Sequence, residues 1–238
     1  MVEGVRLIEE MIQAGREPAF FFYTGDGSES TRAGALVEAL TSSRAEVLAV
    51  SEDVMRFMAD TKTPQGVLAV AGFPEVAYTA PSFSLVLDGV RDPGNLGTIL
   101  RTSEAAGVEQ VVTLRGTVDV FSPKVVRGAM GAHFCLHMLW DGSWEEVERS
   151  LEGKQALLSD PRAGTPYYQV DWTVPTVLMV GGEAHGAGRK ARGLATQRVA
   201  IPMKGRVESL NVAVATGVML FEAARQRTEA SGTAEEGD

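Results

Sequence analysis

The feature that most constrains the fold is the alternation of short apolar runs with helical segments between residues 84 and 225. Strands that are buried on both faces read as continuous apolar runs, and strands separated by helices pair in parallel. The sequence therefore predicts a mostly parallel sheet that helices cover on both faces. The predicted strands are SLVLDGV, EQVVTLR, HFCLHML, QALLS, TVLMVGG and RVAIPM, and the helices are LGTILRTSEAAG, SPKVVRGAM, WEEVERSLEG and a final helix from Ser209 to Arg225.

A smaller alternation of the same kind occupies residues 1–72. It begins with a predicted helix at GVRLIEEMIQ, without a preceding strand, and continues with strands at PAFFFYT, EVLAVS and GVLAVAG and helices at ESTRAGALVEAL and DVMRFMAD. Residues 73–83 contain two prolines and no period, so they are predicted to be a linker. We therefore expect a small α/β domain over residues 1–72, a larger domain over 84–228, and a disordered acidic tail over 229–238.

Charge and composition exclude several classes of protein. The single cysteine, Cys135, rules out an internal disulfide framework or a CxxC metal site. His133 and His137 have HxxxH spacing on or beside the predicted strand HFCLHML, and we interpret them as satisfied or surface histidines and not as metal ligands. No apolar run is long enough to span a membrane, and the N-terminus lacks the features of a signal peptide. We therefore expect a soluble, cytoplasmic protein that needs neither a metal nor a membrane.

The net charge of −9 argues against a nucleic-acid partner, because phosphate binding rests on clustered basic residues. The distribution of charge weakens this objection, since residues 184–206 contain six basic residues and no acidic one. A local site for RNA phosphates is compatible with this segment. A solvated basic face would explain the same residues, and charge alone leaves both interpretations open.

Three Gly-rich turns follow predicted strands, where ligands bind in open α/β sheets. They are DPGNLGTILRTSEAAGV, GGEAHGAG and IPMKGRVESLNVAVATGVMLFEA. None matches a dinucleotide-binding or P-loop motif. Simpler explanations are open for single residues: Ser209 and Asn211 could cap the last helix, Asn95 could be a turn residue, and Arg101 could be solvated.

Taken in this order, the three motifs resemble those of the SpoU/TrmH family of RNA 2′-O-ribose methyltransferases, within the SPOUT class. The resemblance covers residues 84–225. The small first domain is similar to the N-terminal RNA-binding domain of many members. The resemblance implies a parallel sheet whose C-terminal segment forms a deep trefoil knot that holds S-adenosylmethionine. It also implies a homodimer that packs through the final helices of the knot domain, with an active site that borrows from both chains.

The resemblance assigns roles residue by residue. The implied cofactor contacts are Gly181, Ile201 and Leu210, with Met203 nearby, and a side chain at position 181 is expected to stand where the adenosine lies. The implied catalytic residues are Arg101, Asn95, Glu183, Ser209 and Asn211. The expected RNA contacts are Arg127, Lys204 and Arg206.

The implied reaction moves a methyl group from a sulfonium to a ribose hydroxyl. Placing the reacting atoms in line can supply roughly 7–11 kcal/mol of the barrier. A guanidinium is always protonated and offers only donors. We therefore expect Arg101 to hold an RNA phosphate and to stabilise the developing oxyanion, while the proton leaves through a phosphate oxygen, Ser209 or water.

The expected function is thus 2′-O-methylation of a specific nucleotide in RNA, with ribosomal RNA favoured by the two-domain layout. Transfer RNA is an alternative substrate. A non-catalytic RNA-binding assembly factor with the same fold is a second alternative, although it would predict the loss of Arg101, Asn95 or Asn211. Methylation of a base nitrogen fits the signatures NLGTILRT and SLNVAVA less well. The sequence does not identify the nucleotide.

Overall fold

The computed structural model describes residues 1–25, 31–73, 81–183 and 186–235. Its chain forms two compact units, the first made of residues 1–75 with 133–135 and the second of residues 76–132 with 136–238. Each unit has its own sheet.

The first unit is built on a four-stranded sheet. Its strands lie in the order β1 (Val2–Glu3), β4 (Val67–Val70), β2 (Phe20–Tyr23) and β3 (Glu46–Ala49), and its described helices are α1 (Val5–Gln13), α3 (Thr31–Thr41) and α4 (Glu52–Met58). Strand β2 is parallel to β3, whereas β4 is antiparallel to β1 and β2. The prediction that this unit begins with a helix is wrong, because Val2 and Glu3 pair with β4. Two residues are too few to show a period in the sequence.

The second unit contains the predicted parallel sheet. Seven strands pair in the order β7-β6-β5-β10-β8-β11-β9, and each pairing between these strands is parallel in the described part of the chain. The strands are β5 (Phe83–Asp88), β6 (Gln110–Leu114), β7 (His137–Gly142), β8 (Gln155–Ser159), β9 (Thr165–Pro166), β10 (Thr176–Gly181) and β11 (Gln197–Ala200). Phe83, assigned to the linker from the sequence, is the first residue of β5.

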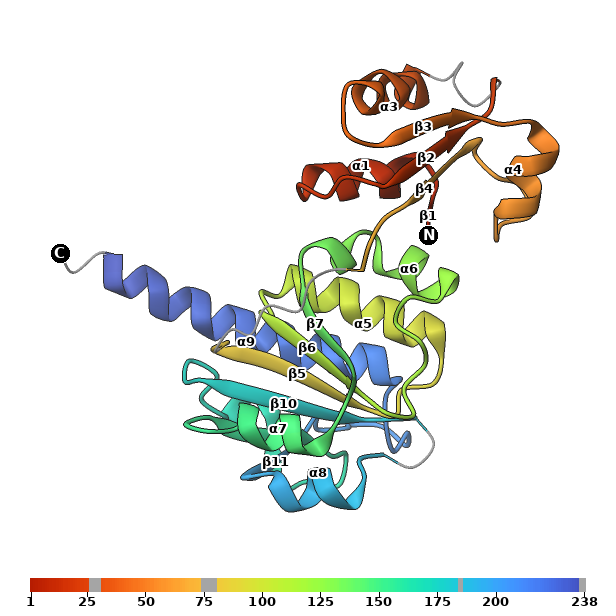
Figure 1. Cartoon of the computed structure of the whole chain (residues 1–238). Coiled ribbons are helices and arrows are strands. Elements are labelled where there is room, and N and C mark those ends of the chain that lie inside the picture. Colours follow the sequence, from red (N-terminus) through yellow and green to blue (C-terminus); the bar gives the residue numbers. More distant parts are fainter. Residues whose placement is uncertain (26–30, 74–80, 184–185, 236–238) are drawn as a thin grey trace. The chain divides into compact units, whose positions relative to one another are not determined.

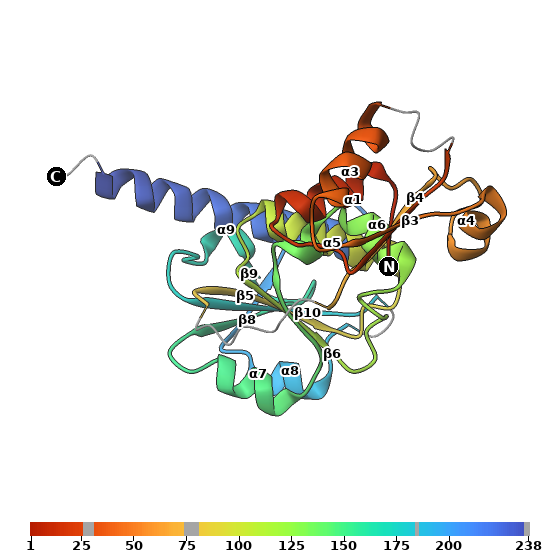
Figure 2. The same cartoon turned by 45° about the horizontal axis from the view of Figure 1, so that its top comes forward.

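Helices cover both faces of this sheet (Figures 1 and 2). They are α5 (Pro93–Ala105), α6 (Pro123–Ala129), α7 (Trp144–Ser150), α8 (Arg189–Leu194) and α9 (Val212–Glu235), with short 3-10 turns η1 (Ala132–Phe134) and η2 (Tyr167–Gln169). Leu85 and Leu87 belong to the core under α5, α6 and α9, whereas Val86 belongs to the core under α7 and α8. Both faces of β5 are thus buried, which explains why Leu85, Val86 and Leu87 are apolar in succession.

One predicted strand begins later than expected. Residues 133–139 were predicted to be extended, but the chain forms the turn η1 first and β7 starts only at His137, opposite Gln110 of β6. Met130 and Gly131 have φ angles of 49° and 95°, so the backbone turns after α6 and cannot yet join the sheet. Phe134, Leu136 and Met138 are apolar at every second position, which is the period of a strand, so the sequence pattern did not separate the turn from β7.

The predicted disordered tail is also wrong for residues 229–235, which continue α9. Alanine and glutamate favour helix, and Arg225 donates to Glu229 one turn later, at 2.7 and 2.8 Å. Residues 236–238 lie outside the described part of the chain.

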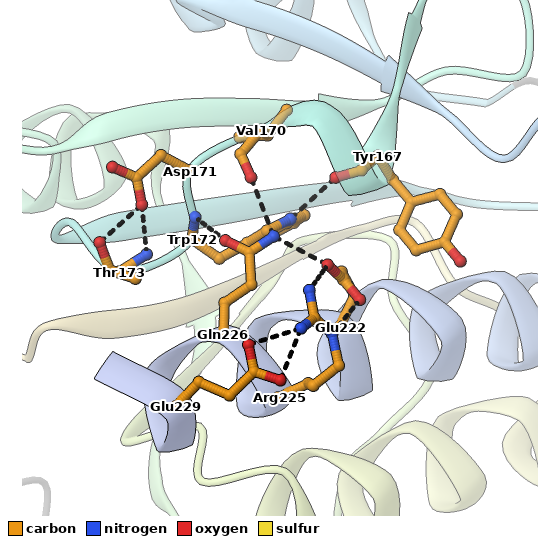
Figure 3. Close-up of polar contacts among 9 residues, drawn as sticks. All are labelled: Tyr167, Val170, Asp171, Trp172, Thr173, Glu222, Arg225, Gln226 and Glu229. Carbon is orange, nitrogen blue, oxygen red and sulfur yellow. Dashed lines mark hydrogen bonds and ion pairs between the residues drawn. The ribbon is translucent and has the colours of Figure 1, made fainter. Parts of the chain in front are cut away.

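The C-terminal half of α9 is fixed to the segment before β10. Figure 3 shows Gln226 between them: its side-chain oxygen accepts from the N–H of Trp172 at 2.9 Å, and its amide nitrogen donates to the carbonyl of Val170 at 3.1 Å. One turn of the helix thus satisfies two backbone groups of a segment that has no sheet partner of its own. Arg227 adds bonds to the backbone of Ser82 and Val174 and lies 4.7 Å from the ring of Phe83.

Two glycines allow α5 and α6 to cross closely. A Cβ atom at Gly97 would lie 2.9 Å from the Cα of Gly128 and 3.0 Å from the carbonyl oxygen of Val125. Arg127 directly precedes this contact on α6, and Arg101 follows it by one turn on α5. The crossing therefore sets the spacing of the helices that carry two predicted functional arginines.

We expect Gly97→Ala to destabilise the second unit by about 1–3 kcal/mol, because the added methyl overpacks a contact between two backbones. Thermal and urea unfolding of the full chain would measure the change. Gly193→Ala is the matched control, since a Cβ there meets nothing within 4 Å and alanine favours helix. Equal stability of the Gly97 variant and the control would contradict the proposed crossing.

Candidate active site

A cavity of about 1060 Å³ opens at the carboxyl ends of β8, β10 and β11, where ligands bind in parallel sheets. All four predicted cofactor contacts line it: Gly181, Ile201, Met203 and Leu210. Three predicted catalytic residues line it too, namely Glu183, Ser209 and Asn211. Residues far apart in the chain therefore meet here because three strand ends share one edge of the sheet.

The chain's own backbone explains the two glycines at the end of β10. A Cβ atom at Gly181 would lie 2.0 Å from the amide nitrogen of Ala187, and one at Gly182 would lie 2.0 Å from the carbonyl oxygen of Gly89. Real Cβ atoms do not come so close to backbone. The protein itself therefore leaves no room for a side chain at position 181, and the expectation that the adenosine lies there stays a prediction.

A hydrogen-bond network joins the three sequence motifs. The carboxylate of Glu183 accepts from the side-chain amide of Asn95 at 2.8 Å and from the backbone N–H groups of Arg91 and Asp92 at 3.2 and 3.4 Å. The side-chain oxygen of Asn95 in turn accepts from the amide of Asn211 at 3.0 Å. Asn95 is thus held between the other two motifs by both ends of its amide.

Glu183 is held as a carboxylate. Burial would raise its pKa, but the hydrogen bonds from Asn95 and from the backbone outweigh burial, so the pKa lies below the ordinary value. A carboxylate of low pKa whose lone pairs already accept several hydrogen bonds is a poor proton acceptor at neutral pH. Its position fits a residue that orients Asn95.

Asn211 caps α9, and Ser209 does not. The side-chain oxygen of Asn211 accepts from the N–H groups of Ala213 at 2.9 Å and Val214 at 3.3 Å. Its amide nitrogen meanwhile donates to Asn95, so capping and the network use different atoms of one side chain. Ser209 lies in the loop before the helix, exposed on the cavity wall. The prediction that both residues stand at the helix start therefore holds for Asn211 only.

The remaining predicted residues do not line the cavity. Arg101 is exposed on α5 and makes no hydrogen bond to a described residue, and Arg127 is half-buried on α6. Lys204 and Arg206 are exposed in the segment between β11 and α9, whose other residues form part of the cavity wall. The structure therefore brings together the network and the predicted cofactor contacts, and leaves the four basic residues outside them.

Sequence reasoning missed an ion pair in the cavity wall. Asp160, which directly follows β8, accepts from the guanidinium of Arg192 at 2.8 Å and from the N–H of Arg162 at 3.0 Å. Burial would raise the pKa of Asp160, but these hydrogen bonds and the positive charge of Arg192 lower it overall. The one available signal was an aspartate after the apolar run QALLS, at a strand end where ligands bind.

Asp88 at the end of β5 was also missed. Its carboxylate accepts from the N–H of Gly188 at 2.8 Å, and its carbonyl accepts from the N–H of Gly182 at 2.8 Å. Asp88 therefore anchors both ends of the loop that carries Glu183. Within the described residues no cluster of His, Cys, Asp and Glu could hold a metal ion, and no helix could cross a membrane.

Comparisons with known proteins identify the family of the chain. The family described as SpoU rRNA Methylase matches residues 82–221, and the MRM3-like substrate binding domain matches residues 1–69. An uncharacterized tRNA/rRNA methyltransferase of Synechocystis sp. is 35% identical over 236 residues, which cover 97% of this chain and 85% of that protein. The 23S rRNA (guanosine(2553)-2′-O)-methyltransferase RlmP of Bacillus subtilis is 35% identical over 173 residues, which cover 72% of this chain and 70% of that protein.

The fold is shared with a solved structure that contains the cofactor. The SpoU methyltransferase AviRb from Streptomyces viridochromogenes, in complex with AdoMet, matches with a TM-score of 0.81 and 29% identity, covering 96% of this chain and 90% of that one. The chain therefore belongs to the SpoU rRNA methylase family, as its three motifs predicted. It is an RNA methyltransferase that depends on S-adenosylmethionine.

We expect Gly181→Ala to abolish binding of S-adenosylmethionine, because the new methyl would push the backbone of Gly186 and Ala187 away from the cavity wall. Isothermal titration of the full chain would measure the affinity. Gly205→Ala is the control, since it lies in the loop after β11 and a Cβ there meets nothing within 4 Å. Wild-type affinity in the Gly181 variant would contradict this prediction and would show that the backbone can shift without loss of S-adenosylmethionine binding.

Proposed function

We propose that the chain transfers a methyl group from S-adenosylmethionine to the 2′-hydroxyl of one nucleotide in ribosomal RNA. The observation that carries this proposal is the network of Glu183, Asn95 and Asn211, which joins all three motifs beside the cavity. A non-catalytic assembly factor would not need these residues held together. The relatives with a described substrate include RlmP, named as a 23S rRNA enzyme, which favours ribosomal over transfer RNA.

The cavity fits the cofactor. Its walls include the apolar side chains of Val180, Ile201, Leu210 and Met219, which suit the flat adenine ring, together with exposed polar groups for the ribose and the amino acid part. Gly181 and Gly182 bring bare backbone to the cavity edge, where N–H and C=O groups can reach a ligand. When bound, S-adenosylmethionine supplies the electrophilic methyl group.

The chain's own residues then position the acceptor. Asn95 and Asn211 present amide groups at the start of α5 and α9, where helix N-termini favour negative charge. Arg101, which is exposed six residues after Asn95 on α5, is proposed to bind an RNA phosphate and to stabilise the oxyanion. The carboxylate of Glu183 is engaged by Asn95 and by the backbone N–H groups of Arg91 and Asp92, so we assign the proton to a phosphate oxygen, Ser209 or water.

The first unit is proposed to select the RNA without a strong general attraction to phosphate. Residues 1–72 contain six basic and eleven acidic side chains, so this unit repels a polyanion overall. The second unit offers exposed Lys204, Arg206 and Arg198, together with Arg127, for phosphate contacts. We propose a cytoplasmic location for this reaction, which the bacterial 23S rRNA methyltransferases among the relatives support.

We propose further that the second unit is knotted. The chain leaves β11, follows the cavity wall through residues 201–211, and enters α9, which packs against α5. The loop of residues 182–188 is tied across to the start of α5 by Glu183 and to β5 by Asp88. This path supports the deep trefoil knot that the family resemblance implies.

A homodimer is proposed through α9. Val214 and Phe221 lie seven residues apart on one face of this helix and are 53% and 54% exposed. Leu210, 37% exposed, precedes them beside the cavity. A second copy that covers this row would bury apolar surface next to the site and could lend its Arg101 or Arg127 to it.

We expect Arg101→Ala to lower kcat for methyl transfer about 100-fold, because the proposed donor to the developing charge is lost. The assay follows labelled S-adenosylmethionine into unmethylated ribosomal RNA, which is then digested to nucleosides. Arg149→Ala, an exposed arginine on α7, is the control. Label in a base-methylated nucleoside would contradict methylation of the 2′-hydroxyl. Full activity of the Arg101 variant would show that Arg101 has no catalytic role.

We expect Phe221→Glu to convert the dimer to monomers, because a charge would be buried in an apolar interface. Sedimentation velocity of the full chain would measure the mass. Phe57→Glu, which changes a 91% exposed phenylalanine on α4 of the first unit, should leave the mass unchanged. A monomeric wild-type chain would contradict the proposed dimer.

A further inference from the structure

The ion pair of Asp160 and Arg192 has no role in the mechanism described above. Both residues line the cavity, on the side of β8 and α8, away from the start of α5. The other charged side chains of the cavity wall are Arg162, Glu183 and Glu208. Glu183 already accepts several hydrogen bonds, and Arg162 and Glu208 are exposed. Arg192 is therefore the cation of this wall that the protein holds in a defined orientation.

Two hydrogen bonds fix the guanidinium of Arg192, and the carboxylate that accepts one of them is itself held in place. Its Nε donates to the carbonyl of Ala187 at 3.2 Å, and its Nη1 donates to Oδ2 of Asp160 at 2.8 Å. The side chain of Asp160 is only 7% exposed, and its other oxygen accepts from the N–H of Arg162. A buried carboxylate with both oxygens engaged cannot swing away, so it holds the planar guanidinium in place.

One edge of the guanidinium remains available to a ligand. Nη2 donates to no described residue and lies beside Gly186, 3.9 Å from where a Cβ of that residue would stand. Gly186 also lines the cavity. A guanidinium has five N–H donors, and the contacts to Ala187 and Asp160 leave those of Nη2 for an oxygen acceptor in the cavity.

We propose that Arg192, oriented by Asp160, binds the carboxylate of the amino acid part of S-adenosylmethionine. This inference rests on the proposed function. The carboxylate is the anionic group of that molecule, and guanidinium–carboxylate hydrogen bonds are about twice as strong as neutral ones. Because Asp160 fixes the guanidinium before the ligand arrives, little side-chain freedom is lost on binding. Asp160 is a positioning residue, and Arg192 is the binding residue.

Titration calorimetry of the full chain with three ligands tests the proposal. S-adenosylmethionine and S-adenosylhomocysteine carry the carboxylate, whereas 5′-methylthioadenosine lacks the whole amino acid part. We expect Arg192→Gln to weaken binding of the first two about tenfold or more, and to leave the Kd of 5′-methylthioadenosine within about twofold. Arg192→Lys keeps the charge but loses the planar guanidinium, so its Kd for these two ligands should lie between those of the wild type and of Arg192→Gln. Asp160→Asn should also weaken binding of the two carboxylate-containing ligands and spare 5′-methylthioadenosine, with a smaller loss of affinity than Arg192→Gln.

Arg189→Gln is the matched control, because Arg189 lies on α8 but does not line the cavity. It should bind all three ligands like the wild type. Equal weakening of all three ligands by Arg192→Gln would overturn the proposal in favour of a structural role. Unchanged Kd values with a raised KM for RNA would overturn it in favour of a phosphate contact. A wild-type chain that binds no S-adenosylmethionine would contradict the proposed function itself.

Discussion

The site depends on a contact between backbones at the end of β10. Gly181 lies under Gly186 and Ala187, and Gly182 lies against Gly89, at distances that no side chain could tolerate. This packing carries the loop after β10 toward the turn between β5 and α5, where Glu183 reaches two backbone N–H groups and Asn95. Asn95 then orients Asn211 at the start of α9. One glycine pair thus positions residues from three distant parts of the chain.

Compensated charge is the second organising principle of the cavity. Asp160 is matched by Arg192, and the carboxylate of Glu183 is matched by amide and backbone donors. Their pKa values are both lowered, so both are ionised at neutral pH. The groups that line the reaction site therefore serve as fixed dipoles and charges. Fixed groups cost little reorganisation, which suits a reaction whose barrier falls mainly through alignment.

The sequence predicted what depends on local pattern and on recognisable motifs. The parallel sheet and its two helical layers followed from the apolar runs, whereas the cavity-lining residues Gly181, Ile201 and Leu210 followed from the resemblance of the three motifs to the family. The sequence-based prediction failed where a structural feature depends on a contact between residues far apart in the sequence. The two-residue strand β1 exists only because β4 pairs with it, and the pairing of Asp160 with Arg192 joins positions that no local pattern relates. The acidic residues after 228 were read as disorder, although helix propensity and ion pairs extend α9 through them.

The order of strands in the sheet has a consequence for how the protein is made. Strand β10 pairs with β5, about ninety residues earlier in the chain, so the centre of the sheet closes only after most of the second unit has been synthesised. Pairings between such distant segments form slowly, because the loop between them must first lose its freedom. The apolar faces of β5 and β6 are therefore exposed on a nascent chain that still lacks β10. Protection by chaperones matters most in that interval, before the floor of the cavity exists.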